Sequence, residues 1–183
     1  MPTKNLYCII GESGSGKTTL VNRLRDYGYE PVPSYTDRAP RYPGEEGHIF
    51  ISEAEFDFLR DADKLIAYTV FDGHQYGVTA ELLNKCSTYV IDPAGVEYLK
   101  QHYTDRPIKV IYVTASEGTR RSRMGKRGDS VEDVERRLEH DRAVFNGVGA
   151  IMADAIVDTF FFTELDAVRC IVDNIEYWEG DFK

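Results

Sequence analysis

One eight-residue motif near the start of the chain constrains the fold more than any other feature. Residues 11–18, GESGSGKT, satisfy the pattern G-x-x-x-x-G-K-[ST] between the apolar run Leu6–Ile10 and a helical pattern from Lys17 to about Asp26. Glycines in such a loop let backbone N–H groups surround a phosphate, and the N-terminus of the helix adds the positive end of its dipole. The motif therefore predicts a nucleoside triphosphate site at the end of a buried strand.

The residue types within this loop, called the P-loop below, predict separate roles. Lys17 is expected to bridge the β- and γ-phosphates of ATP, and the hydroxyl of Thr18 is expected to be a ligand of the Mg²⁺ that accompanies the nucleotide. The predicted ATP-binding residues are Gly11, Ser13, Gly14, Ser15, Gly16, Lys17, Thr18 and Thr19.

Strand-like and helix-like segments alternate along much of the remaining chain. Three apolar runs are each followed by a helical pattern: 89–91 by 93–102, 109–113 by 116–123, and 155–157 by 163–178. This alternation predicts an α/β fold, namely a P-loop NTPase core with a parallel sheet flanked by helices. Ligands of such a sheet bind beyond the carboxyl ends of its strands.

The first interruption of this alternation predicts an inserted lobe at 34–80. It contains two short strand candidates, 49–51 and 66–71, and between them a helix that begins with a capping box of Ser52 and Glu55.

Two arginines of the lobe are placed to bind a phosphate. Arg38 and Arg41 lie three residues apart, and Pro40 stiffens the segment between them. Two guanidinium groups suit a doubly charged phosphate, because each can bind it through two hydrogen bonds.

The second interruption predicts a lid at 118–140. Residues 118–128 contain five lysine and arginine residues and no acid, and a helix then begins at a cap of Ser130 and Asp133 and runs towards Asn146. Such a cationic segment is suited to close over phosphates and to exclude water.

Length and charge narrow the possible functions. The 183 residues fit a single domain, 1–183, with its core in 1–33 and 81–183. The 22 Lys and Arg against 31 Asp and Glu give a net charge of −9, which argues against nucleic-acid polymers and membrane surfaces as partners. Three cysteines at scattered spacing predict a reduced, cytoplasmic protein. We expect a monomer or a homodimer.

Several motifs together resemble the guanylate kinase family over nearly the whole chain. After the P-loop come S-x-T-x-R-x-P-R at 34–41, G-x-x-F-I-S-E-x-E-F at 47–56 and G-x-x-Y-G at 73–77. The resemblance implies ATP-dependent phosphorylation of a nucleoside monophosphate, with GMP or dGMP converted to GDP or dGDP.

The resemblance also implies roles for individual residues. It implies that the lobe at 34–80 binds the acceptor, the molecule that receives the phosphoryl group, through Ser34, Arg38, Arg41, Tyr76 and Asp92. With His48, which stands at a ligand position of the family, these are the predicted acceptor-binding residues. The predicted catalytic residues are Lys17 of the P-loop together with Arg38, Arg123, Arg127 and Arg137. The last three arginines would reach the donor phosphates from the lid. For Asp92 two interpretations remain open, a reader of the base and a carboxylate in the magnesium shell.

The sequence departs from the family pattern at the acceptor site. His48 stands where the family has an aromatic phosphate ligand, although imidazole can also donate a hydrogen bond to phosphate. Ala67 aligns with the glutamate that reads guanine, and Val78 aligns with a small hydroxyl residue. If the alignment places Ala67 at the base, Ala67→Glu is expected to raise selectivity for GMP.

Three alternatives therefore remain open at this stage. The residues around His48, Ala67 and Val78 resemble ribose 1,5-bisphosphate phosphokinases, which have no base to read. A kinase for another or a modified nucleoside monophosphate is a second alternative. The third is a non-catalytic guanylate-kinase-like interaction module, against which the intact P-loop and lid arginines argue.

Overall fold

A parallel sheet of four strands forms the core in the computed structural model, which describes residues 3–40, 43–71 and 73–180. Its strands lie in the order β6-β1-β7-β8, with bounds β1 (Leu6–Ile10), β6 (Thr88–Val90), β7 (Ile108–Thr114) and β8 (Ala155–Asp158). β1 is central and fully buried, and it pairs in parallel with both β6 and β7. The P-loop leaves the carboxyl end of this central strand, as the motif predicts.

Helices cover both faces of the core sheet. Side chains of β1 alternate between the faces: Leu6, Cys8 and Ile10 belong to one apolar cluster, and Tyr7 and Ile9 to the other. Helices α1 (Lys17–Leu24) and α8 (Glu164–Glu179) pack on the face of Tyr7 and Ile9. Helix α4 (Pro93–His102) packs on the face of Leu6, Cys8 and Ile10, and the short α7 (Val148–Met152) lies next to it. A 3₁₀ turn (Arg25–Tyr27) extends α1. The predicted α/β fold is confirmed.

A second sheet lies beside the core, in the order β3-β2-β5-β4. Its strands are β2 (Ser34–Thr36), β3 (His48–Phe50), β4 (Leu65–Phe71) and β5 (His74–Thr79); α2 (Glu53–Asp61) connects β3 to β4, and α3 (Ala80–Asn84) follows β5. We call residues 34–79 the lobe. The capping box of Ser52 and Glu55 is present at the start of α2.

The lobe begins with a strand that was not among the candidates predicted from the sequence. Residues 34–36 form β2 because they pair on both sides, with β3 in parallel and with β5 antiparallel. These partners lie more than ten residues away in the sequence, so the local pattern of apolar and polar residues does not predict the strand.

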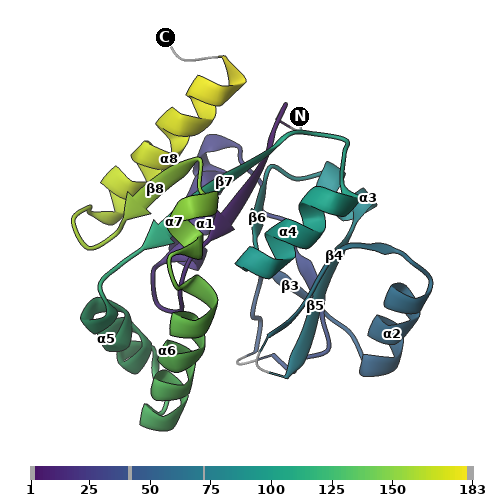
Figure 1. The fold of residues 1–183 in the computed structure, drawn as a ribbon, viewed down its shortest axis with the longest axis horizontal. Helices are drawn as coiled ribbons and strands as arrows, with labels where there is room; N and C mark the ends of the chain where they lie inside the picture. Colours follow the sequence, from purple (N-terminus) through teal and green to yellow (C-terminus); the bar gives the residue numbers. More distant parts are fainter. Residues whose placement is uncertain (1–2, 41–42, 72, 181–183) are drawn as a thin grey trace.

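Two helices form the segment predicted to be a lid, and we call them the lid helices. α5 (Glu117–Arg127) continues one turn beyond the predicted end at Arg123 and ends at Gly128, whose positive φ of 99° suits glycine. α6 (Val131–Phe145) begins with Ser130 as its cap and ends at Asn146, as predicted. Figure 1 shows α5 and α6 on one side and the lobe on the other, both beyond the edge at which the core strands end.

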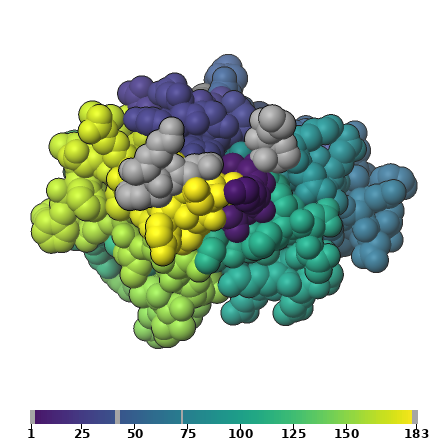
Figure 2. All heavy atoms as spheres, turned by 90° about the horizontal axis from the view of Figure 1, so that it is seen from above, coloured from purple at the N-terminus to yellow at the C-terminus, as the bar shows by residue number. Residues whose placement is uncertain are grey.

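The two ends of the described chain meet on the face that Figure 2 shows, where the first residues (purple) lie beside the end of α8 (yellow). The carboxylate of Glu179 accepts hydrogen bonds from the backbone N–H groups of Lys4 and Asn5. Among the described helices, none combines the length and the apolar character needed to cross a membrane.

Candidate active site

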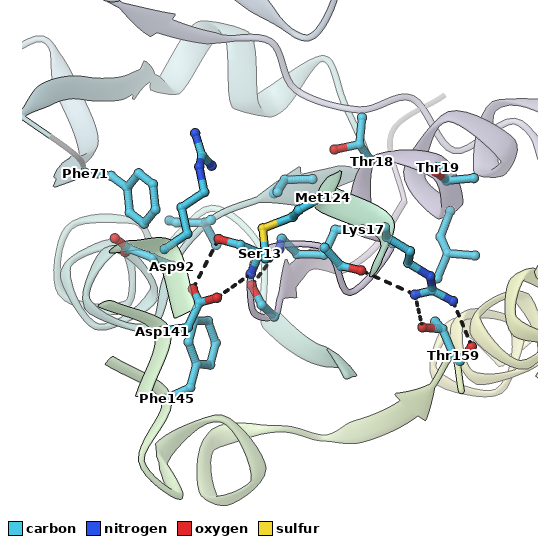
Figure 3. A pocket seen from close by; sticks show the side chains of 18 of the residues that line it. Ser13, Lys17, Thr18, Thr19, Phe71, Asp92, Met124, Asp141, Phe145 and Thr159 are labelled. Atoms are coloured by element: carbon cyan, nitrogen blue, oxygen red, sulfur yellow. Dashed lines mark hydrogen bonds between the residues drawn. The ribbon is translucent and has the colours of Figure 1, made fainter. Parts of the chain in front are cut away.

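One cleft of about 590 Å³ joins the P-loop, the lobe and the lid. Most of the predicted site residues line it: Gly11, Ser13, Gly14, Gly16, Lys17, Thr18, Thr19, Ser34, His48, Tyr76, Asp92, Arg123, Arg127 and Arg137. Figure 3 shows Phe71 and Asp92 on one side of this cleft and Thr18, Thr19 and Thr159 towards the other, with Ser13 and Lys17 between them. The cleft therefore has a side formed mainly by the lobe, at which the acceptor is predicted to bind and which we call the acceptor side, and a P-loop side.

The P-loop is held between the core sheet and the lid. A Cβ atom at Gly11 would lie 2.1 Å from the carbonyl oxygen of Val113 in β7, and one at Gly14 would lie 2.7 Å from that of Arg120 in α5. Both glycines have positive φ, 154° and 77°. Only glycine fits this backbone, and the loop's N–H groups can then curl around a phosphate. The side chain of Ser15 is fully buried and does not line the cleft.

Lys17 lies at the centre of the cleft and bends back towards its own loop. Its Nζ donates hydrogen bonds to the carbonyl oxygens of Gly11 at 2.6 Å and Glu12 at 2.9 Å. Burial lowers the pKa of Lys17 to about 8, and the nearby carboxylates of Asp141 and Glu12 limit this shift. The ammonium group is thus present near neutral pH and lost in mildly alkaline solution.

Binding of a triphosphate is therefore expected to weaken as the pH rises through 8. Because neutral Lys17 cannot attract phosphates, the affinity for ATP should fall about tenfold between roughly pH 7.5 and 9.5. Isothermal titration calorimetry across this range measures it. Lys17→Arg is the matched control, since guanidinium stays charged, and its affinity should not change with pH. A wild-type affinity that stays constant would contradict the assignment.

On the acceptor side, three predicted residues lie together. The Oγ of Ser34 and the Nδ1 of His48 are 2.8 Å apart, and the rings of His48 and Tyr76 have centroids 5.6 Å apart. They come from β2, β3 and β5, adjacent strands whose pairing puts these side chains on one face. Hydroxyl and imidazole groups gathered in this way can bind an acceptor phosphate.

Arg38 lies behind this group and does not line the cleft. Its Nε donates to the hydroxyl of Tyr76 at 3.1 Å, and its two terminal nitrogens bind the carboxylate of Glu45 at 2.8 and 3.2 Å. The side chains of Arg38 and Glu45 are both buried. In this structure Arg38 supports Tyr76, and its direct contact with phosphate stays a prediction. Arg41 lies outside the described residues.

Asp92 faces the cleft with both carboxylate oxygens engaged. One accepts a hydrogen bond from the hydroxyl of Thr69 at 2.6 Å, and the other caps α4 by accepting from the backbone N–H of Gly95 at 2.6 Å. Each oxygen retains a lone pair for a ligand. The bond to Thr69 links the core to β4 of the lobe, which places Asp92 on the acceptor side.

The lid arginines are engaged rather than extended. Arg123 donates to the carbonyl oxygens of Gly14 and Ser15 at 3.3 and 3.2 Å and to the hydroxyl of Thr159 at 2.8 Å. Arg127 binds Asp129 through two nitrogens, and the Nε of Arg137 lies 3.9 Å from the same carboxylate. All three arginines line the cleft, and their contact with the donor phosphates stays a prediction.

Other residues that line the cleft did not emerge from the sequence. They include Thr69, Phe71, Met124, Asp141, Val144, Phe145, Thr159 and Phe162. Asp141 could have been found, since it lies one helical turn after Arg137. Phe71 lies edge-on against His140 of α6, with centroids 4.7 Å apart, so the lobe and the lid are in contact.

A P-loop at the carboxyl end of a parallel sheet, facing a separate lobe across one cleft, defines the class as a P-loop kinase fold. No protein-family model matches the chain. The chain is similar to the guanylate kinase of Bordetella pertussis, with 32% identity over 149 residues, which cover 75% of this chain and 68% of that protein. It is also similar to the guanylate kinase of Porphyromonas gingivalis, with 30% identity over 147 residues, covering 73% and 78%.

A solved structure supports the same fold. The crystal structure of guanylate kinase from Anaplasma phagocytophilum aligns with a TM-score of 0.65 at 19% identity, covering 97% of this chain and 88% of that one. Taken with the sequence relatives, the chain belongs to the guanylate kinase family, and it is a phosphotransferase.

Proposed function

We propose that this protein transfers the γ-phosphate of ATP to GMP or dGMP and so forms GDP or dGDP. The observation that carries the proposal is the single cleft in which the P-loop lies opposite Ser34, His48 and Tyr76. Two phosphorylated substrates would meet there. The relatives named guanylate kinase favour guanine as the base. The three cysteines are free thiols, which fits the proposed cytoplasmic location.

The proposed reaction needs alignment and charge neutralisation more than a base. The second pKa of a phosphate monoester is near 6, so the acceptor phosphate is mostly a dianion at neutral pH. One of its oxygens attacks the γ-phosphorus, the bond from that phosphorus to the β-bridging oxygen breaks, and ADP leaves. Lys17 and the lid arginines would neutralise the charge on the transferred group.

Mg²⁺ is proposed to accompany ATP. No three His, Cys, Asp or Glu side chains in the described part of the chain come together to hold a metal by themselves. This fits Mg²⁺, which is held mainly by substrate phosphates, waters and one or two hard oxygen ligands. Thr18, whose side chain lines the cleft beside Lys17, supplies such an oxygen. When bound, the ion would neutralise phosphate charge.

A coupled assay of ATP consumption tests the proposed acceptor. The panel is GMP, dGMP, AMP, UMP, TMP and ribose 1,5-bisphosphate, each with Mg·ATP. We expect the highest kcat/KM with GMP or dGMP. Turnover of ribose 1,5-bisphosphate alone would assign the protein to the sugar-phosphate alternative, and turnover of another nucleotide alone would assign it to a different base.

The acceptor phosphate is expected to depend on His48. Replacing it with phenylalanine removes both ring nitrogens, including the Nδ1 that lies 2.8 Å from the Oγ of Ser34, but keeps an aromatic ring. The loss of one hydrogen bond to a charged phosphate should raise the KM for the acceptor about tenfold and leave the KM for ATP unchanged. Steady-state kinetics with each substrate varied in turn measure the two values. His48→Tyr, which restores a donor, should retain most of the affinity; equal KM values for all three proteins would exclude a phosphate contact.

A further inference from the structure

A buried ion pair links the two lid helices to each other. Arg120 of α5 donates from its NH1 to the Oδ2 of Asp141 in α6 at 2.9 Å. The residues are only 5% and 2% exposed, respectively, so the pair is shielded from solvent. Such a pair costs desolvation free energy, and replacement by apolar side chains is often neutral for stability. Its presence beside the cleft therefore calls for a role beyond packing.

The same carboxylate holds the P-loop. The Oδ2 of Asp141 accepts the backbone N–H of Ser13 at 2.9 Å, and its Oδ1 accepts the Ser13 hydroxyl at 3.3 Å. Figure 3 shows Asp141 beneath Ser13 with these bonds drawn. The NH1 of Arg120 also reaches the carbonyl oxygen of Ser13 at 3.4 Å. The backbone N–H and C=O groups of Ser13 are thus both bound by the Arg120–Asp141 pair.

Helix α5 reinforces the attachment further along the loop. Arg123 binds the next two carbonyl oxygens, those of Gly14 and Ser15. The backbone of Arg120 lies so close to Gly14 that a Cβ there would come within 2.7 Å of its carbonyl oxygen. The lid helices and the P-loop therefore form one packed unit.

We propose that Asp141, held by Arg120, is a positioning residue that fixes the P-loop at Ser13 and so presets it for the donor nucleotide. A preset loop loses less conformational freedom when the phosphates bind, and affinity rises accordingly. Asp141 acts through Ser13 and has no role at the acceptor, so its effect should be confined to ATP. The inference rests on the proposed use of ATP.

The test compares three variants by calorimetric titration with Mg·ATP, together with KM values for ATP and the acceptor. Asp141→Ala should bind ATP about tenfold more weakly, because the N–H of Ser13 loses its partner. Asp141→Asn should stay within about threefold of wild type, since its oxygen can accept from both Ser13 and Arg120 while its NH₂ group faces the Ser13 hydroxyl. The KM for the acceptor should be unchanged throughout.

A double variant separates positioning from folding. Arg120→Leu combined with Asp141→Ala removes both charges of the pair and leaves neither one buried without its partner, so its Tm should rise above that of Asp141→Ala alone. Its affinity for ATP should nevertheless remain about tenfold below wild type, because the Ser13 N–H is still unpaired.

The possible outcomes distinguish a failure of the positioning role from a failure of the proposed function. A stable double variant that binds ATP as wild type does, or Asp141→Asn as weak as Asp141→Ala, would overturn the positioning role. A wild-type protein that binds no ATP would instead contradict the proposed function and the inference that rests on it.

Discussion

Lys17→Ala should lower kcat for phosphoryl transfer by about a thousandfold or more. The ammonium group is the cation that lies within the P-loop itself, and it is the predicted bridge between the β- and γ-phosphates. Removing one preorganised donor of transition-state charge typically costs a factor of about 100 to 1,000, and this donor carries a full charge. Single-turnover measurements with saturating ATP and GMP measure the loss at the chemical step.

The variant should still fold, which keeps the result interpretable. The Nζ of Lys17 donates hydrogen bonds to the carbonyl oxygens of Gly11 and Glu12, and in the variant these two oxygens can be solvated in the cleft. Circular dichroism and Tm should match wild type. Lys85→Ala is a matched control, because Lys85 pairs with Glu81 on the exposed face of α3 and should leave kcat unchanged. If Lys17→Ala kept every activity of the protein, the kinase assignment would be rejected in favour of a non-catalytic module.

Features encoded locally could be predicted from the sequence. The P-loop has fixed glycine positions because its backbone needs positive φ, and the start of α6 could be predicted because the side chain of Ser130 caps it. The core strands are continuous apolar runs because parallel strands are buried on both faces. These signals require no knowledge of distant partners, and they were sufficient for the fold class.

Features that depend on distant partners could not be predicted. The side chain of Arg38 pairs with that of Glu45, and the bond from Arg38 to Tyr76 joins residues 38 apart in sequence. The contact between Asp141 and Ser13 spans 128 residues. Composition and spacing place each charge on an element, but only packing decides which opposite charge it meets.

The base-reading positions show the same limit. The alignment places Ala67 and Val78 where the family pattern has polar base readers, so a cleft position was expected. In the structure the two residues are register partners in β4 and β5, both are fully buried, and neither lines the cleft. Two residues further along β4, on the same face, Thr69 does line the cleft and binds Asp92. Thr69 of β4 and Asp92, the cap of α4, are thus polar side chains that line the acceptor side of the cleft.

Ala67→Glu should therefore destabilise the protein instead of sharpening its selectivity for GMP. Ala67 is 0% exposed and belongs to the same apolar cluster as Val78, Val96 and Leu99, with β4 packed on α4. A glutamate would add volume to a filled space and bury a carboxyl group without a partner. We expect the free energy of unfolding to fall by about 3 kcal/mol, measured by urea denaturation at neutral pH.

The pH dependence separates the charge from the volume. Burial would raise the pKa of the introduced carboxyl above its unfolded value of about 4.3. The unfolded chain therefore releases this proton at a lower pH than the folded protein does, and the free energy of unfolding falls as the pH rises above about 4.3. Relative to wild type, Ala67→Glu should thus lose more stability at about pH 8 than at about pH 5. Ala67→Gln, of the same size but uncharged, should lose the same amount at both. A glutamate variant that is as stable as wild type and prefers guanine would show instead that position 67 reaches the cleft, and that its alanine is the reason for a relaxed choice of base.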